Sequence, residues 1–195
     1  RSKTYTLTLG YVSSTLKVGD QVEVLIGPIA NGGHFVARHN GQVIFVRHAI
    51  TGETALVEIT SISSKLARAD AISIIKASPD RIESVCKFSG PGKCGGCDFL
   101  HISLTRQLEL KAQVVTELFS RIAKMEIKFE MRSVAPSSGL HWRTRVDFAI
   151  SKNGNIGLYS ARSNELIEID RCEAVLEDIN NLDIFKRTWR GDDRV

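Results

Sequence analysis

The residues best suited to chemistry are four cysteines, three of which lie within twelve residues. The stretch CKFSGPGKCGGCDFLH contains Cys86, Cys94 and Cys97, and Cys172 follows 75 residues after Cys97. The start of the chain does not resemble a signal peptide, and disulfides are rare in reducing compartments. A redox pair would use only Cys94 and Cys97, in a thioredoxin-like unit that the pattern lacks. A metal or cluster site is the favoured interpretation.

The cysteine spacing bears on the choice between zinc and an iron–sulfur cluster. Structural zinc sites usually combine two Cys-x2-Cys knuckles, whereas one loop of three cysteines and a distant fourth suits a four-iron cluster. Gly95 and Gly96 let the backbone curl and direct N–H groups at sulfur. Zinc is the alternative, with His101 in place of Cys172. Otherwise His101 is interpreted as a local hydrogen-bonding residue near the start of a helix.

The same loop contains G-x-G-x-x-G from Gly90 to Gly95. A dinucleotide-binding fingerprint must follow a buried strand and open a helix, with an acidic residue about 20 positions further on. Pro91 interrupts the motif here, and Cys94 occupies one of its positions. We therefore assign the glycines to the cysteine loop.

The elements that precede the cysteines are predicted to be short strands. The expected ranges are 5–9, 20–27, 34–38, 42–48, 53–62 and 71–77. Asn40-Gly41 between two alternating segments is a strong hairpin signal. Residues 1–79 are therefore predicted to form an all-β small barrel of the OB type, a fold that often binds nucleic acid.

Residues 80–195 are predicted to form an α+β cluster domain. A helix is expected over 103–124, with Ser103 as N-cap. Its apolar stripe is predicted to comprise Leu104, Leu108, Val115, Leu118, Phe119 and Ile122. Strands are expected at 131–135, 143–150, 155–159 and 165–169, and a short helix at 176–189. The expected fold is thus a small barrel followed by an α+β domain that holds the cysteines.

Charge weakly favours a polyanionic partner. The net charge is +4, and residues 1–79 carry eight basic against five acidic side chains. No apolar segment approaches the length of about 20 residues that spans a bilayer. The candidate RNA-binding residues are Arg38, Arg47, Lys65, Arg143 and Arg145.

Two patterns suggest how these residues would contact RNA. Arg143 and Arg145 are expected on the same face of a strand, where guanidinium groups bind phosphate or base edges. Phe35 and Phe45 are aromatic candidates for base stacking, although Phe45 is favoured as a core residue.

Four segments, in order, resemble one known family. GGHFVARHNGQVIFVRHAITGE resembles the core of a TRAM domain, and CKFSGPGKCGGCDFLHISLTRQLELK resembles the cluster loop of bacterial RNA uracil-5-methyltransferases that carry a four-iron cluster. HWRTRVDFAI resembles the family's aromatic-Arg-x-Arg strand, and IDRCEAV places Cys172 at the fourth ligand position. The seven residues between Cys86 and Cys94 are more than many members have.

This resemblance implies the N-terminal part of a cytoplasmic enzyme that methylates rRNA or tRNA. It implies a 4Fe–4S cluster on Cys86, Cys94, Cys97 and Cys172. All four cysteines match cluster positions, so we expect S-adenosylmethionine and the nucleophilic cysteine in a catalytic domain beyond Val195. The alternatives are a stand-alone RNA-binding protein with a structural metal or cluster, and a methylthiotransferase-like radical enzyme.

Overall fold

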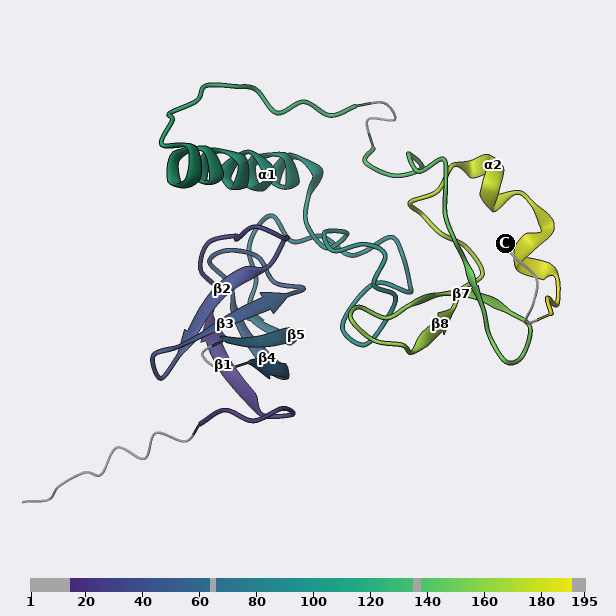
Figure 1. Cartoon of the computed structure of the whole chain (residues 1–195), viewed down its shortest axis with the longest axis horizontal. Coiled ribbons are helices and arrows are strands. Elements are labelled where there is room, and N and C mark those ends of the chain that lie inside the picture. Colours follow the sequence, from purple (N-terminus) through teal and green to yellow (C-terminus); the bar gives the residue numbers. More distant parts are fainter. Residues whose placement is uncertain (1–14, 64–65, 135–137, 191–195) are drawn as a thin grey trace, which may run out of the picture.

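The structure is a computed structural model that describes residues 15–63, 66–134 and 138–190 (Figure 1). Its first part is a five-stranded sheet. The strands are β1 (Gln21–Leu25), β2 (Phe35–His39), β3 (Gln42–Arg47), β4 (Thr54–Ser63) and β5 (Leu66–Lys76). Their order is β1-β4-β5-β3-β2, and only β3 and β5 pair in parallel. The Gly27 and Val36 N–H groups donate to the Val36 and Pro28 carbonyls, so the segment after β1 meets β2 and the sheet curls toward closure.

Alternating side chains fill the barrel. Ile44 and Val46 of β3 point inward and are fully buried. The inward positions of β5 are alanines, which leave room for the larger residues of β4. Asn40 and Gly41 both have positive φ, as a two-residue hairpin turn requires. The predicted hairpin and β-rich first part are confirmed; the assignment to the OB type stays a prediction. The strand expected at 5–9 lies outside the described residues.

Helix α1 (Leu104–Leu118) covers one end of the barrel and continues into a π-helical turn, η1 (Phe119–Ala123). The Ser103 hydroxyl accepts a hydrogen bond from the Arg106 N–H, which confirms the predicted N-cap. The predicted apolar stripe was wrong in part: its first four residues are half-buried, but it missed the most buried position of the helix. The helix residue in the barrel core is Leu110, with Val114 packed against it, whereas Phe119 and Ile122 are exposed.

The second sheet is small and antiparallel, in the order β6 (Ala149–Ile150), β7 (Ile156–Tyr159) and β8 (Leu166–Glu168). The strand predicted over 143–150 is reduced to its last two residues. No strand forms over residues 131–134, and residue 135 lies outside the described part. The helix predicted at 176–189 is two short turns, α2 (Glu177–Asn180) and the 3₁₀ turn η2 (Asp183–Lys186).

Two apolar cores divide the chain, and a buried ion pair anchors the segment between them. One core fills the barrel and includes Ile102 and Leu110; the other lies beside the second sheet and includes Cys172. Arg81 donates to both carboxylate oxygens of fully buried Glu53, at 2.6 and 2.7 Å. Residues on the C-terminal side of the predicted boundary at residue 79, among them Ile102 and Leu110, therefore pack into the core of the barrel.

Candidate metal centre

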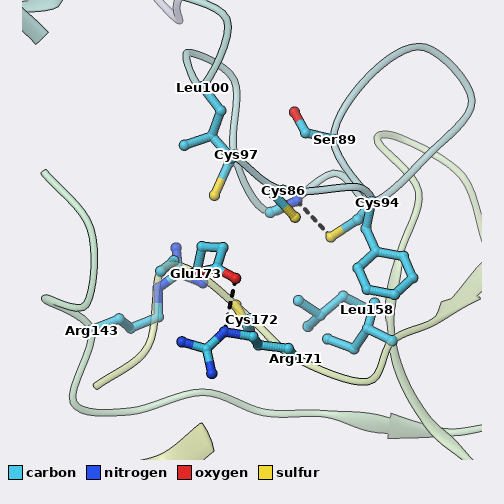
Figure 2. A pocket seen from close by; sticks show the side chains of 14 residues that line it. Cys86, Ser89, Cys94, Cys97, Leu100, Arg143, Leu158, Arg171, Cys172 and Glu173 are labelled. Atoms are coloured by element: carbon cyan, nitrogen blue, oxygen red, sulfur yellow. Dashed lines mark hydrogen bonds and ion pairs between the residues drawn. The ribbon is translucent and has the colours of Figure 1, made fainter. Parts of the chain in front are cut away.

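All four cysteines line one pocket. Cys86, Cys94 and Cys97 come from the loop between the barrel and α1, and Cys172 comes from the segment after β8. Figure 2 shows the three loop sulfurs on one side of this space and Cys172 on the other. None of the four takes part in a disulfide. The structure therefore brings together the two segments that the sequence separates by 75 residues.

Backbone hydrogen bonds shape the loop around the thiols. The Ser89 N–H donates to the Cys86 carbonyl at 3.1 Å, and the Cys94 N–H donates to the Phe88 carbonyl at 3.0 Å. The Gly96 N–H approaches the Cys94 sulfur at 3.4 Å. Such a donor near sulfur is the kind of contact that tunes a thiolate ligand.

The opposite wall is fixed by the chain around Cys172. The Cys172 N–H donates to the Asn180 side-chain oxygen, and the Asn180 amide donates back to the Cys172 carbonyl, both at 3.0 Å. Arg143 pairs in parallel with Val175, and its N–H donates to the Ala174 carbonyl. The Arg143 side chain thereby reaches the wall of the cysteine pocket.

Burial makes three of the thiols weak acids. Desolvation, followed by the neighbouring Cys172, raises the pKa of Cys97 to about 11, although Arg143 acts in the opposite direction. Desolvation also raises the pKa values of Cys86 and Cys94. Without a cation these groups hold their protons, so a bound metal centre must displace the protons and compensate the thiolate charge.

The donor arrangement does not converge on one point. Within the described ranges, no three His, Cys, Asp or Glu side chains are grouped so that they could hold a single metal ion. A tetrahedral zinc site needs its thiolates about 2.3 Å from one centre. Soft thiolate donors suit both zinc and iron–sulfur clusters.

The predicted RNA-binding residues do not form one surface. Arg38 and Arg145 are exposed, Arg47 donates to Asp98 at 2.5 Å, and Arg143 faces the thiols. Lys65 lies outside the described residues. The prediction that Arg143 and Arg145 share a strand face was wrong, because residues 143–148 are not a strand and Arg143 pairs with distant Val175. RNA contact by each arginine stays a prediction.

Three further expectations are resolved by burial. Phe35 is buried in the barrel core and cannot stack on RNA. Phe45 was wrongly favoured as core: it lies between inward-facing Ile44 and Val46, is half-buried, and lines a surface pocket. Buried His101 bonds the Ala49 carbonyl at 3.1 Å and does not line the cysteine pocket, so it is no substitute for Cys172.

Sequence reasoning missed two charged residues that the fold brings to the barrel, Asp98 and Arg162. Asp98 follows Cys97 directly and pairs with Arg47. Arg162 has a positive φ of 55° in the turn after β7 and lies near Arg47 and Arg68. The partners of both residues are distant in sequence. The one local signal in the sequence was the turn-like composition of residues 160–164, which contain Arg162.

The fold and site thus define a class: a small β-barrel module joined to a thiol-lined centre. Residues 15–72 match the TRAM domain family, so the barrel is a TRAM domain. The described residues include no helix with the length and apolar character of a membrane span.

The chain is also similar to curated proteins that are named RNA methyltransferases. The chain is 41% identical over 188 residues to an uncharacterized RNA methyltransferase of Streptomyces coelicolor, covering 89% of this chain and 41% of the relative. It is 32% identical over 171 residues to the 23S rRNA (uracil(1939)-C(5))-methyltransferase RlmD of Shewanella amazonensis, covering 85% of this chain and 38% of the relative. The chain thus spans about two fifths of the length of these relatives.

A solved structure shares the fold. It is the Pyrococcus abyssi tRNA (uracil-54, C5)-methyltransferase in complex with S-adenosyl-L-homocysteine, with a TM-score of 0.52 and 24% identity. The match covers 80% of this chain and 34% of that one.

Proposed function

We propose that this chain is the RNA-recognition and cluster-bearing part of an S-adenosylmethionine-dependent RNA uracil-5-methyltransferase that acts on rRNA or tRNA. The observation that carries the proposal is the meeting of four thiols from two distant segments behind a TRAM domain. Relatives named RNA methyltransferases, one of them a uracil-5 enzyme, support the reaction class.

The proposed cofactor of this part is a 4Fe–4S cluster held by Cys86, Cys94, Cys97 and Cys172. The soft sulfur donors and their gathering around one pocket support it. Arg143 and Arg171 line the same pocket and bring positive charge next to the thiolates. Bound there, the cluster would tie the loop 86–97 to the segment after β8 and add its binding free energy to folding.

Methyl transfer itself would use residues outside this chain. With all four cysteines assigned to the cluster, S-adenosylmethionine and the nucleophile belong to the part of the relatives that this chain does not match. A uracil in folded RNA must be unstacked to react, at a cost of a few kcal/mol. The barrel and the cluster-bearing part would supply the additional grip on the RNA that offsets this cost.

Two measurements test the proposal separately. The full-length protein, incubated with methyl-tritiated S-adenosylmethionine and unmodified rRNA or tRNA, should label C5 of a uridine; absence of labelled 5-methyluridine with both RNAs contradicts the activity. Anaerobic purification of the chain with iron and sulfide analysis should give about four of each per chain. One zinc and no sulfide would instead establish the zinc alternative.

A further inference from the structure

A second pocket lies where the barrel meets the turn between β7 and β8. This junction pocket, with a cavity volume of about 130 Å³, is lined by His34, Phe45, Arg47, Arg68 and Arg162, among others. Four of these side chains come from the barrel, and Arg162 comes from the turn. Neither the thiol centre nor methyl transfer gives this pocket a role.

The junction pocket is lined by three arginines and one acid, Asp70, and with Asp98 paired to Arg47 this leaves one positive charge uncompensated. Arg47 is paired with Asp98 at 2.5 Å. For Arg68 and Arg162, no ion pair forms with any residue in the described part of the chain. The pKa of Arg162 is lowered, first by burial and then by the positive charges of the nearby Arg68 and Arg47. An excess of positive charge, with Arg68 and Arg162 outside any ion pair, favours an anionic ligand.

Uncharged groups beside the arginines complete a recognition surface. The Nε2 atom of His34 is buried and has no hydrogen-bond partner in the structure. Burial and the three arginines lower the pKa of His34, so a neutral imidazole can donate a single hydrogen bond there. Phe45 lines the pocket with the Arg68 guanidinium 6.0 Å from its ring centre. A register shift in β4, between Ile59 and Ser61, lies at the pocket rim; such bulges redirect side chains beside binding sites.

We propose that the junction pocket binds one nucleotide unit of single-stranded RNA, with its phosphodiester on Arg68 and Arg162 and its base against Phe45. The inference rests on the proposed RNA-binding function and adds a specific subsite to it. Planar guanidinium groups match phosphate oxygens, and an aromatic ring accepts any base by stacking. An acidic protein segment would use the arginines but would have no use for Phe45.

The cysteine loop holds both sides of this subsite. Asp98, next to Cys97, pairs with Arg47 on the barrel. The Gly95 N–H donates to the Tyr159 carbonyl at 3.0 Å, and Cys94 forms a bridge with Ser160, two residues before Arg162. A loop ordered by its metal centre therefore fixes the separation between the barrel arginines and Arg162.

The test is fluorescence anisotropy with a 5′-labelled, twelve-nucleotide oligouridine and the chain purified anaerobically with its metal content measured. Arg68→Ala and Arg162→Ala should each weaken binding about tenfold or more, because a charge-assisted hydrogen bond is lost. Each should also reduce the slope of log affinity against log salt by about 0.7, as one lost phosphate contact predicts. Phe45→Leu should weaken binding about tenfold and leave the salt slope unchanged.

The controls separate the subsite from the function on which it rests. Arg121→Ala, at an exposed arginine of η1, removes the same charge and should leave affinity within twofold. An oligonucleotide of abasic ribose phosphates should bind the wild type and Phe45→Leu equally. Arg68→Lys and Arg162→Lys keep the charge and should bind between alanine and wild type, provided circular dichroism shows native folding.

Each contrary result has a distinct meaning. If the wild type binds RNA and both arginine-to-alanine variants match Arg121→Ala, the junction subsite is refuted while RNA binding stands. If the arginine variants lose affinity but Phe45→Leu does not, the pocket contacts the RNA phosphate alone, and base stacking on Phe45 is refuted. If the wild type does not bind RNA, the proposed function fails first.

Discussion

Glu53 is a fully buried carboxylate that links the barrel to the segment leading to the cysteines. It accepts hydrogen bonds from the Ile50 and Ser78 N–H groups and from the Nε and Nη2 groups of Arg81. Burial alone would raise the pKa of Glu53, but these donors more than offset it, so the pKa is lowered. The ionised form is therefore the one that the fold stabilises.

Removing this charge should destabilise the chain strongly. Glu53→Gln leaves the partly buried Arg81 without its counterion, so we expect unfolding to become easier by about 3 kcal/mol. Urea denaturation followed by circular dichroism measures the change. Glu58→Gln, on the strand β4 that follows Glu53 and with a surface contact to Gln21, is the matched control and should change stability by less than about 1 kcal/mol. Equal stabilities of the two variants would contradict this role of Glu53.

Two buried histidines make stability depend on pH. Burial lowers the pKa values of His48 and His101 to about 4, and their ring centres are 6.1 Å apart. The unfolded chain binds these protons near pH 6.5 and the folded chain does not, so their contribution is complete above about pH 6.5 and is lost as the pH falls toward 4. One such histidine contributes about 3 kcal/mol. Glu53 adds a further loss only below its unfolded pKa, near 4.5.

The measurement is the free energy of unfolding by urea at pH 7.5, 5.5 and 4.5. The wild type should lose stability between the first two values, and His48→Phe should flatten this part of the curve. Gln42→Phe, at the half-buried start of β3, introduces a phenylalanine without removing a titratable group, so it is the control and should retain the wild-type slope. A wild-type stability that is constant from pH 7.5 to 5.5 would show that the histidines are not held neutral.

At the residue level, the sequence predicted what a side chain can do better than what it contacts. The thiols were identified because cysteines are rare and their spacing is diagnostic. The partners of Arg47 and Arg143 were not identified, because Asp98 and Val175 reach them through tertiary folding. Phe45 was misjudged since an alternating strand does not reveal which face is covered.

Among the elements, the cysteine loop and the β7–β8 turn touch without space for another atom. A Cβ on Gly95 would lie 2.7 Å from the Ala161 nitrogen and 2.8 Å from its Cα. Both are backbone atoms of the turn that carries Arg162, and they cannot rotate away. The glycine is therefore required for close approach between two backbones.

Gly95→Ala should separate these elements. We expect a loss of about 2 kcal/mol in unfolding free energy, together with reduced iron content and weaker oligouridine binding. Asn164→Ala, at an exposed position of the same β7–β8 turn, is the control. Thermal unfolding, iron analysis and anisotropy measure the three effects. A Gly95→Ala protein with wild-type iron content and affinity would show that the contact does not position the turn.

Local signals predicted the elements of the barrel well and those of the second part poorly. In the barrel, β2 and β3 pair across a two-residue turn, so neighbouring residues determine the hairpin. In the second part, residues 143–146 have strand-like composition, but Arg143 bonds to Ala174 and Leu176 and the chain then runs on without a ladder. Alternation of polar and apolar residues indicates that a segment prefers an extended conformation, but it does not show whether a neighbouring strand is available to pair with it.

For the whole molecule, the thiol centre is the connection between the second core and the loop that leaves the barrel. On the proposed cluster assignment, Cys97→Ala should remove the visible absorbance of the cluster and lower solubility at the same time, since metal binding contributes to folding. Ser89→Ala, in the same pocket wall, is the control and should retain both. Absorbance spectra and the soluble fraction after expression give the answer. A cluster-free variant that stays soluble and binds RNA would contradict a structural role for the cluster.

At this scale the order of modules was predictable, and their packing was not. The TRAM domain and the cysteine segments were identified from motifs in the right order, and the family match confirms the first. The inclusion of Ile102 and Leu110 in the barrel core escaped prediction because burial of a helix face depends on its neighbour. The junction pocket was not predicted either, because its lining residues come from the barrel and from the β7–β8 turn, which are distant in sequence.

The closed shape of the turn between Cys86 and Cys94 bears on how this protein can vary during evolution. The Cys94 N–H returns to the Phe88 carbonyl, and the Lys93 N–H returns to the Gly90 carbonyl, so residues 89–93 leave and rejoin the loop at almost the same place. Pro91, Gly92 and Lys93 are exposed. Insertions and deletions in this turn can be accommodated in solvent while Cys94 keeps its place. The interval between the first two cysteines can thus change in length without moving Cys94, whereas the two residues between Cys94 and Cys97 are confined by the turn behind them.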